Sequence, residues 1–163
     1  MFKGIYYHQA DEKSRLRIPA KLKAQLGEKY FITRGGLGSL VIAPESYFEE
    51  NIFSKIKDID YTDVEAMKLI RAITSFMFDI EEDNQGRFVV PTVLRDYANI
   101  IKNVVTIGAG NVIEVWSEER FNQSINGNFE YIQELPEGSQ DFNEILKAFN
   151  NLLKRKSSAQ TDL

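Results

Sequence analysis

Two aspartate–arginine pairs stand out in this sequence because they share one spacing and each precedes a proline. Asp11 and Arg15 lie in DEKSRLRIP, and Asp83 and Arg87 lie in DNQGRFVVP. A guanidinium held beside a turn can reach a phosphate or the edge of a guanine base, and the aspartate can orient it by a charge-assisted hydrogen bond. The same groups also suit a structural pair that closes the turn, and the two roles are compatible.

Positive charge is concentrated around the first pair, although the formal net charge of the chain is -4. Residues 1–34 carry eight Lys or Arg against three Asp or Glu. On a strand that begins near Arg15, we expect Leu16 and Ile18 to face the core, with Arg15 and Arg17 pointing outward together. Because clustered basic side chains drive phosphate binding, this outward face is the candidate site.

An internal repeat positions both pairs. An offset of 72 residues superposes the first motif on the second, with Pro19 on Pro91, and an offset of 73 then aligns Gly35 with Gly108. Each copy predicts an extended segment interrupted by a turn, a short helix after the proline, and a β-hairpin around a glycine-rich turn. One copy is too short to bury a core alone, so we expect the two copies to share one.

Two longer helices are predicted outside the copies. Thr62 and Glu65 form a capping-box pattern before VEAMKLIRAITSFMF, whose apolar residues recur at helical spacing. Residues 139–156 place apolar side chains along one stripe of a helix, and residues 157–163 are expected to form a frayed tail.

Several classes of site lack support in the sequence. The chain has one histidine, His8, and no cysteine, so it offers no catalytic triad, metal-ligand cluster or disulfide framework. We therefore expect no enzyme activity and no cofactor. No apolar run approaches the roughly 20 residues that span a bilayer, so we expect no membrane association and a cytoplasmic protein.

The duplicated motif, together with the opening MFKGIYYHQADEKSR, resembles the MraZ family of bacterial transcriptional regulators over about residues 1–125. The resemblance implies an α+β fold of tandem, pseudo-twofold AbrB-like (swapped-hairpin) β-barrel modules with short helices, plus a C-terminal helix. It also implies a homo-oligomeric ring. The expected organisation is a first module at 1–57, a connecting helix at 58–76, a second module at 77–125, and a C-terminal helix and tail at 126–163.

Double-stranded DNA is the partner that this resemblance implies. The expected targets are promoter-proximal direct repeats upstream of the division and cell-wall operon that includes the regulator's own gene, which implies association with the nucleoid. Arg15 matches the family's DNA-contacting arginine and Asp11 its motif partner, with Arg87 and Asp83 as their equivalents. Resemblance and charge together add further expected contacts: Lys13, Arg17, Lys3, Lys21 and Lys23.

Two departures leave questions open. The family usually has glycine before the motif arginine, as at Gly86, but the first copy has Ser14, which raises the question of whether that turn is shaped differently. Val89 stands where the first copy has Arg17, which favours a lesser role for the second copy in DNA contact. The alternative function is a non-enzymatic assembly module that binds a protein partner through the C-terminal helix, without salt-dependent affinity for DNA.

Overall fold

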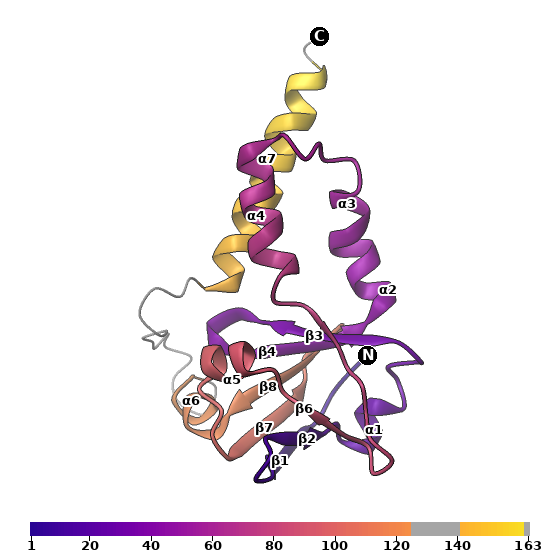
Figure 1. Cartoon of the computed structure of the whole chain (residues 1–163), viewed down its shortest axis with the longest axis vertical. Helices are drawn as coiled ribbons and strands as arrows, with labels where there is room; N and C mark the ends of the chain where they lie inside the picture. Colours follow the sequence, from indigo (N-terminus) through magenta and orange to yellow (C-terminus); the bar gives the residue numbers. More distant parts are fainter. Residues whose placement is uncertain (125–140, 162–163) are drawn as a thin grey trace.

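A computed structural model describes residues 1–124 and 141–161, and it has an α+β architecture. Six antiparallel strands form one sheet in the order β1-β7-β8-β4-β3-β5, and β2 pairs with β6 in a separate two-stranded ribbon (Figure 1). The strands are β1 (Ile5–Gln9), β2 (Arg15–Arg17), β3 (Tyr30–Arg34), β4 (Leu40–Pro44), β5 (Phe78–Asp79), β6 (Arg87–Val89), β7 (Asn103–Gly108) and β8 (Ile113–Ser117).

Some helices lie beside the ribbon or at one edge of the sheet. The others form a layer over the sheet face that is opposite the ribbon (Figure 1). The helices are α1 (Ala20–Lys23), η1 (Gly36–Gly38), α2 (Glu45–Phe48), η2 (Glu49–Phe53), α3 (Ser54–Ile56), α4 (Val64–Thr74), α5 (Thr92–Ala98), α6 (Glu118–Ser124) and α7 (Phe142–Thr161). Part of the expected segment 126–163 lies outside the described residues, namely 126–140 and 162–163. None of the described helices has both the length and the apolar character needed to cross a membrane.

The two sequence copies exchange their first strands. β1 of the first copy pairs with β7 of the second, from Ile5 with Ile107 to Gln9 with Asn103. The corresponding strand of the second copy, β5, pairs with β3 of the first. β2 also pairs with β6, so the two strands that lead to the motif proline in each copy are hydrogen-bonded to strands of the other copy. The single six-stranded sheet is therefore built from strands of both copies.

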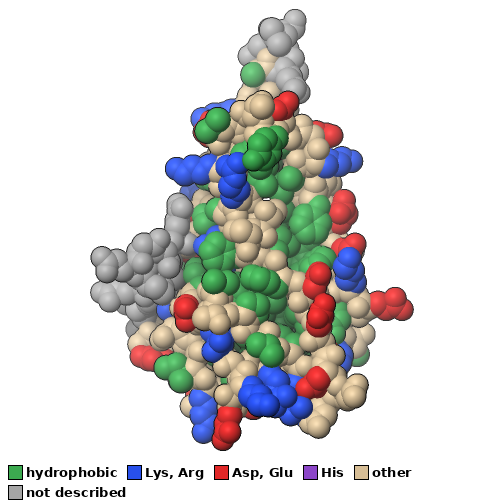
Figure 2. All heavy atoms as spheres, viewed as in Figure 1, with side chains coloured by type: hydrophobic (Ala, Val, Ile, Leu, Met, Phe, Trp, Pro, Cys, Tyr) green, Lys and Arg blue, Asp and Glu red, His purple; other side chains and the backbone are tan. Residues whose placement is uncertain are grey.

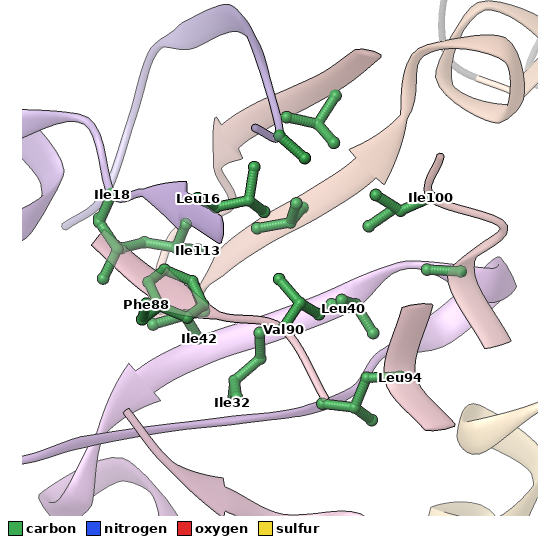
Figure 3. Close-up of a cluster of buried hydrophobic side chains, with 14 of the residues drawn as sticks. Leu16, Ile18, Ile32, Leu40, Ile42, Phe88, Val90, Leu94, Ile100 and Ile113 are labelled. Atoms are coloured by element: carbon green, nitrogen blue, oxygen red, sulfur yellow. The ribbon is translucent and has the colours of Figure 1, made fainter. Parts of the chain in front are cut away.

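One core between the sheet and the ribbon draws side chains from both copies (Figure 3). Leu16 and Phe88 lie opposite each other on the inner face of the ribbon, and both are buried. Leu22 of α1 and Leu94 of α5, which follow the two motif prolines, are fully buried in the same cluster. The predicted shared core is therefore confirmed.

A second apolar cluster occupies the other face of the sheet. Side chains alternate across a strand, so Ile42 of β4 faces the first core while Ala43 faces the second. The predicted stripe of α7 is confirmed, since Phe142, Ile145 and Phe149 are buried in this cluster with residues of α4. The helix layer therefore packs on the sheet face opposite the ribbon.

Two details of the helix ends differ from the sequence prediction. The N-cap of α4 is Asp63, whose carboxylate accepts a hydrogen bond from the backbone N–H of Ala66 at 3.1 Å. Thr62 does not cap the helix because its hydroxyl donates to Asp60 at 2.6 Å. The expected frayed tail is also wrong for residues 157–161, which continue α7 beyond ion pairs that tie the helix to α4.

Candidate nucleic-acid interface

The first motif turn, residues 11–15, is closed by the carboxylate of Asp11. One oxygen, Oδ1, accepts hydrogen bonds from the backbone N–H groups of Lys13 and Arg15, both at 2.9 Å. The other, Oδ2, accepts from Nε of the Arg15 side chain at 2.7 Å. The same carboxylate thus fixes the backbone of the turn and orients the guanidinium.

The second motif turn, residues 83–87, repeats this geometry. Oδ1 of Asp83 accepts from the backbone N–H groups of Gln85 and Arg87 at 2.9 Å, and Oδ2 accepts from Nε of Arg87 at 2.8 Å. Backbone donation from Arg87 is the main cause that lowers the pKa of Asp83 to about 2, and donation from Arg15 likewise lowers the pKa of Asp11. The expected structural pairing is confirmed in both copies, and both carboxylates are ionised at neutral pH.

Ser14 takes the same backbone conformation as the glycine of the second turn. Its φ is 59°, and that of Gly86 is 75°, so both residues lie in the left-handed region. The backbone N–H of each donates to the carbonyl of its motif aspartate, at 2.9 Å for Ser14 and 3.0 Å for Gly86. The serine therefore does not reshape the first turn.

The β2–β6 ribbon separates an apolar face from a basic one. Arg15 pairs with Val89 and Arg17 with Arg87, on the face opposite the buried Leu16–Phe88 pair. Arg17 and Val89 are exposed, and Arg15 and Arg87 are partly exposed. The guanidinium of Arg17 also donates to Oε1 of Gln85 at 3.4 Å. Figure 2 shows Lys and Arg side chains gathered at the end of the molecule where Figure 1 places the ribbon, with acidic side chains beside them.

The remaining expected contacts lie at different distances from this face. Lys13 is exposed within the first turn, and Lys21 is exposed on α1. Lys23 forms an ion pair with Glu82, which also accepts a hydrogen bond from the hydroxyl of Tyr30. Lys3 precedes β1 and lies against Gly108, at the opposite end of that strand from Asp11.

One residue at this face was not predicted from the sequence. Arg95 of α5 donates from Nη1 to Oγ of Ser14 at 2.8 Å, across 81 residues of chain. The available signal was the repeat itself, because the offset of 72 residues makes Arg95 the counterpart of Lys23. Lys23 itself lies near Gly86, so each motif turn has a basic side chain from the helix of the other copy beside it.

Comparison with known proteins covers both copies of the motif. A family model described as "MraZ protein, putative antitoxin-like" matches residues 1–71 and 77–137 of the chain. The chain belongs to the MraZ family. The match to this MraZ model contains both motif turns and the whole ribbon, and it ends before α7 begins.

Named MraZ relatives are similar over nearly their entire length. A protein of Carboxydothermus hydrogenoformans is 37% identical over 142 residues, which cover 87% of this chain and 99% of that protein. A protein of Heliobacterium modesticaldum is 37% identical over 137 residues, covering 82% of this chain and 95% of that protein. One from Oenococcus oeni is 34% identical, with coverages of 87% and 99%. All three carry the name "Transcriptional regulator MraZ".

Proposed function

We propose that this chain is a sequence-specific transcriptional regulator that binds double-stranded DNA. The observation that carries the proposal is the outward face of the β2–β6 ribbon, where Arg15, Arg17 and Arg87 converge. A two-stranded β-ribbon fits the major groove, and an arginine can bind guanine O6 and N7 bidentately. The names of the MraZ relatives agree with this role.

Different roles follow for the individual residues. Arg15 and Arg87 are the proposed base contacts, because Asp11 and Asp83 fix the direction of their guanidinium groups. Exposed side chains beside them are the proposed phosphate contacts: Arg17, Lys13 and Lys21. Lys23 and Lys3 have less support, because Lys23 is paired with Glu82 and Lys3 lies at the far end of β1.

We further infer that the chain consists of two AbrB-like swapped-hairpin modules, 1–57 and 77–125, joined through 58–76, and that protomers assemble into a ring. The exchange of β1 and β5 between the copies supports the swapped arrangement. Each neutralised phosphate adds roughly 0.9 to the slope of log affinity against log salt, and linked copies on repeated boxes gain avidity. This arrangement suits direct repeats near the promoter of the division and cell-wall operon, and a location at the nucleoid.

The alternative function, a protein-assembly module that recruits a partner through the C-terminal helix, has less support. The apolar stripe of α7 is buried against α4 and the sheet of the same chain. Ion pairs of Arg155 with Glu65 and of Lys156 with Asp63 tie these two helices further together. A partner would therefore have to displace contacts that the chain already makes.

The test is direct binding to DNA taken from immediately upstream of the gene. Fluorescence anisotropy at several salt concentrations should show an affinity that falls with salt, and Arg15→Ala should abolish specific binding while the protein stays folded at the assay temperature. Lys147→Ala, on the exposed face of α7, is the matched control for loss of one positive charge. Unchanged binding by Arg15→Ala would remove the central residue of the proposal, and a wild-type protein without salt-dependent affinity would remove DNA as the ligand.

A further inference from the structure

We propose that Arg95, which lies in the second copy, is a positioning residue that holds the first motif turn in its DNA-binding conformation. This inference rests on the proposed function. Three nitrogens of the Arg95 guanidinium have separate acceptors: Oγ of Ser14 at 2.8 Å, the carbonyl of Val90 at 3.1 Å, and Oγ1 of Thr92 at 2.9 Å. The group is therefore fixed in the plane that reaches Ser14.

Ser14 is the residue of the turn that most needs such support. A left-handed backbone is unfavourable for a residue with a Cβ, and Ser14 has a φ of 59° between Lys13 and Arg15. The carbonyl of Ser14 also accepts a hydrogen bond from the backbone N–H of Val90 at 3.2 Å. The turn is thus tied at two points to the junction of β6 and α5, and the Arg95 bond offsets the cost of serine at this position.

The second motif turn is supported in another way. Gly86 adopts its φ of 75° without a Cβ, and it has no side chain that could receive a bond. Lys23, the counterpart of Arg95, lies near Gly86 but forms an ion pair with Glu82. The serine in the first turn is therefore matched by an arginine in α5, and the glycine in the second by a lysine in α1.

These contacts assign Arg95 a role that acts through Ser14 and not through a phosphate. Its guanidinium orders the backbone beside Arg15, the proposed base contact, before DNA arrives. Preorganisation of this kind raises affinity by reducing the entropy lost on binding. The effect should be confined to the first turn, because the second turn has no bond from Arg95 among the described residues.

A double-mutant cycle with Ser14→Gly and Arg95→Met tests this role, with anisotropy on the upstream DNA and amide hydrogen exchange on the free protein. Methionine keeps the aliphatic stem and removes the donors. Arg95→Met should weaken DNA binding by roughly 10- to 150-fold, since it removes the hydrogen bond from a charged donor to Ser14. It should also speed exchange at residues 11–15 and leave residues 83–87 unchanged. In the Ser14→Gly background most of the loss of affinity should disappear, with the salt slope unaltered.

Other outcomes would overturn the inference. Additive losses with a salt slope reduced by roughly 0.9 would make Arg95 a direct phosphate contact. Unchanged exchange at residues 11–15 would show that it does not order the turn.

If Arg95→Met fails to fold, Arg95→Lys replaces it, because lysine keeps the charge without the planar fork, and it should give the same faster exchange. A wild-type protein that binds no DNA would overturn the proposed function and this role together, whereas failure of the cycle alone leaves wild-type binding intact.

Discussion

Arg15 lies between carboxylates of both copies: its Nη1 is 3.7 Å from Oδ2 of Asp83, and its Nε is 2.7 Å from Oδ2 of Asp11. Asp83 meanwhile accepts a hydrogen bond from Arg87 of its own turn. The two motif turns, 72 residues apart in sequence, therefore share one electrostatic network. Both carboxylates remain ionised, so they fix the directions of the Arg15 and Arg87 guanidinium groups. The same carboxylates partly offset the positive charge of the ribbon.

The first prediction concerns acid stability, with Asp83→Asn as the test. The folded protein lowers the pKa of Asp83 from 3.8 to about 2, so this carboxylate stabilises the fold fully above pH 3.8. Its contribution is lost as the pH falls from 3.8 through about 2. Denaturant unfolding should show a fall in stability over this window that is shallower in Asp83→Asn.

The control for this experiment is Asp58→Asn, an exposed aspartate outside both motif turns. This variant should keep the wild-type pH profile. An identical profile in Asp83→Asn would mean that the turn does not favour the ionised carboxylate.

A second prediction exchanges the two residues by which the halves of the ribbon differ. Val89 is 58% exposed beside Arg15 and occupies the position equivalent to Arg17. Val89→Arg should increase the slope of log affinity against log salt by roughly 0.9, and Arg17→Val should decrease it by a similar amount. Anisotropy on the upstream DNA measures both slopes, with Lys147→Ala on α7 as the control that should leave the slope unchanged.

An unchanged slope in Val89→Arg, with a reduced slope in Arg17→Val, would mean that only the first half of the ribbon meets phosphates. The opposite pattern would contradict the assignment of Arg17.

The faces of the ribbon were predictable because side-chain alternation is local. Leu16 and Ile18 faced the core as the pattern predicted, and the motif aspartates closed their turns. The pairing of β1 with β7 was not predictable in this way, because the two copies offer similar strands and local pattern does not choose between them. The Arg95–Ser14 contact was missed for the same reason: it depends on which copy lies beside which.

Choices between neighbouring polar residues were also beyond local patterns. Thr62 and Asp63 are both good N-cap residues, and the sequence favoured Thr62 through its spacing from Glu65. In the folded chain Asp60 engages the Thr62 hydroxyl, while Asp63 caps α4 and pairs with Lys156 of α7. The residue that caps α4 is therefore also the one that pairs with α7, and this tertiary contact is not visible in the local sequence.

A third prediction concerns Gly108, where the backbones of two segments meet. An added Cβ would lie against the backbone of Phe2 and Lys3, too close for a real contact, and backbone atoms cannot move aside as a flexible side chain would. Gly108→Ala should destabilise the protein by about 1–3 kcal/mol, as overpacking does. It should also speed amide exchange at Phe2 and Gly110, whose N–H groups bond each other's carbonyls.

Ala109→Ser, at an exposed neighbouring position, is the matched control and should leave both the stability and the exchange unchanged. Wild-type behaviour of Gly108→Ala would contradict the close approach of the N-terminal segment to β7.

The last prediction separates the helix layer from the ribbon. Phe149 of α7 is 1% exposed in the apolar cluster on the sheet face opposite the ribbon, so Phe149→Ala should cost about 3–5 kcal/mol of unfolding free energy. Asn150→Ala, on the exposed side of the same helix, should change stability by no more than about 0.5 kcal/mol. Denaturant unfolding measures both changes in stability.

At a temperature where both variants are folded, their affinity for the upstream DNA should equal that of the wild type, because neither residue reaches the ribbon. A small cost for Phe149→Ala would mean that α7 does not dock on α4 in solution, and loss of DNA affinity in the folded variant would mean that the helix layer supports the DNA-binding face.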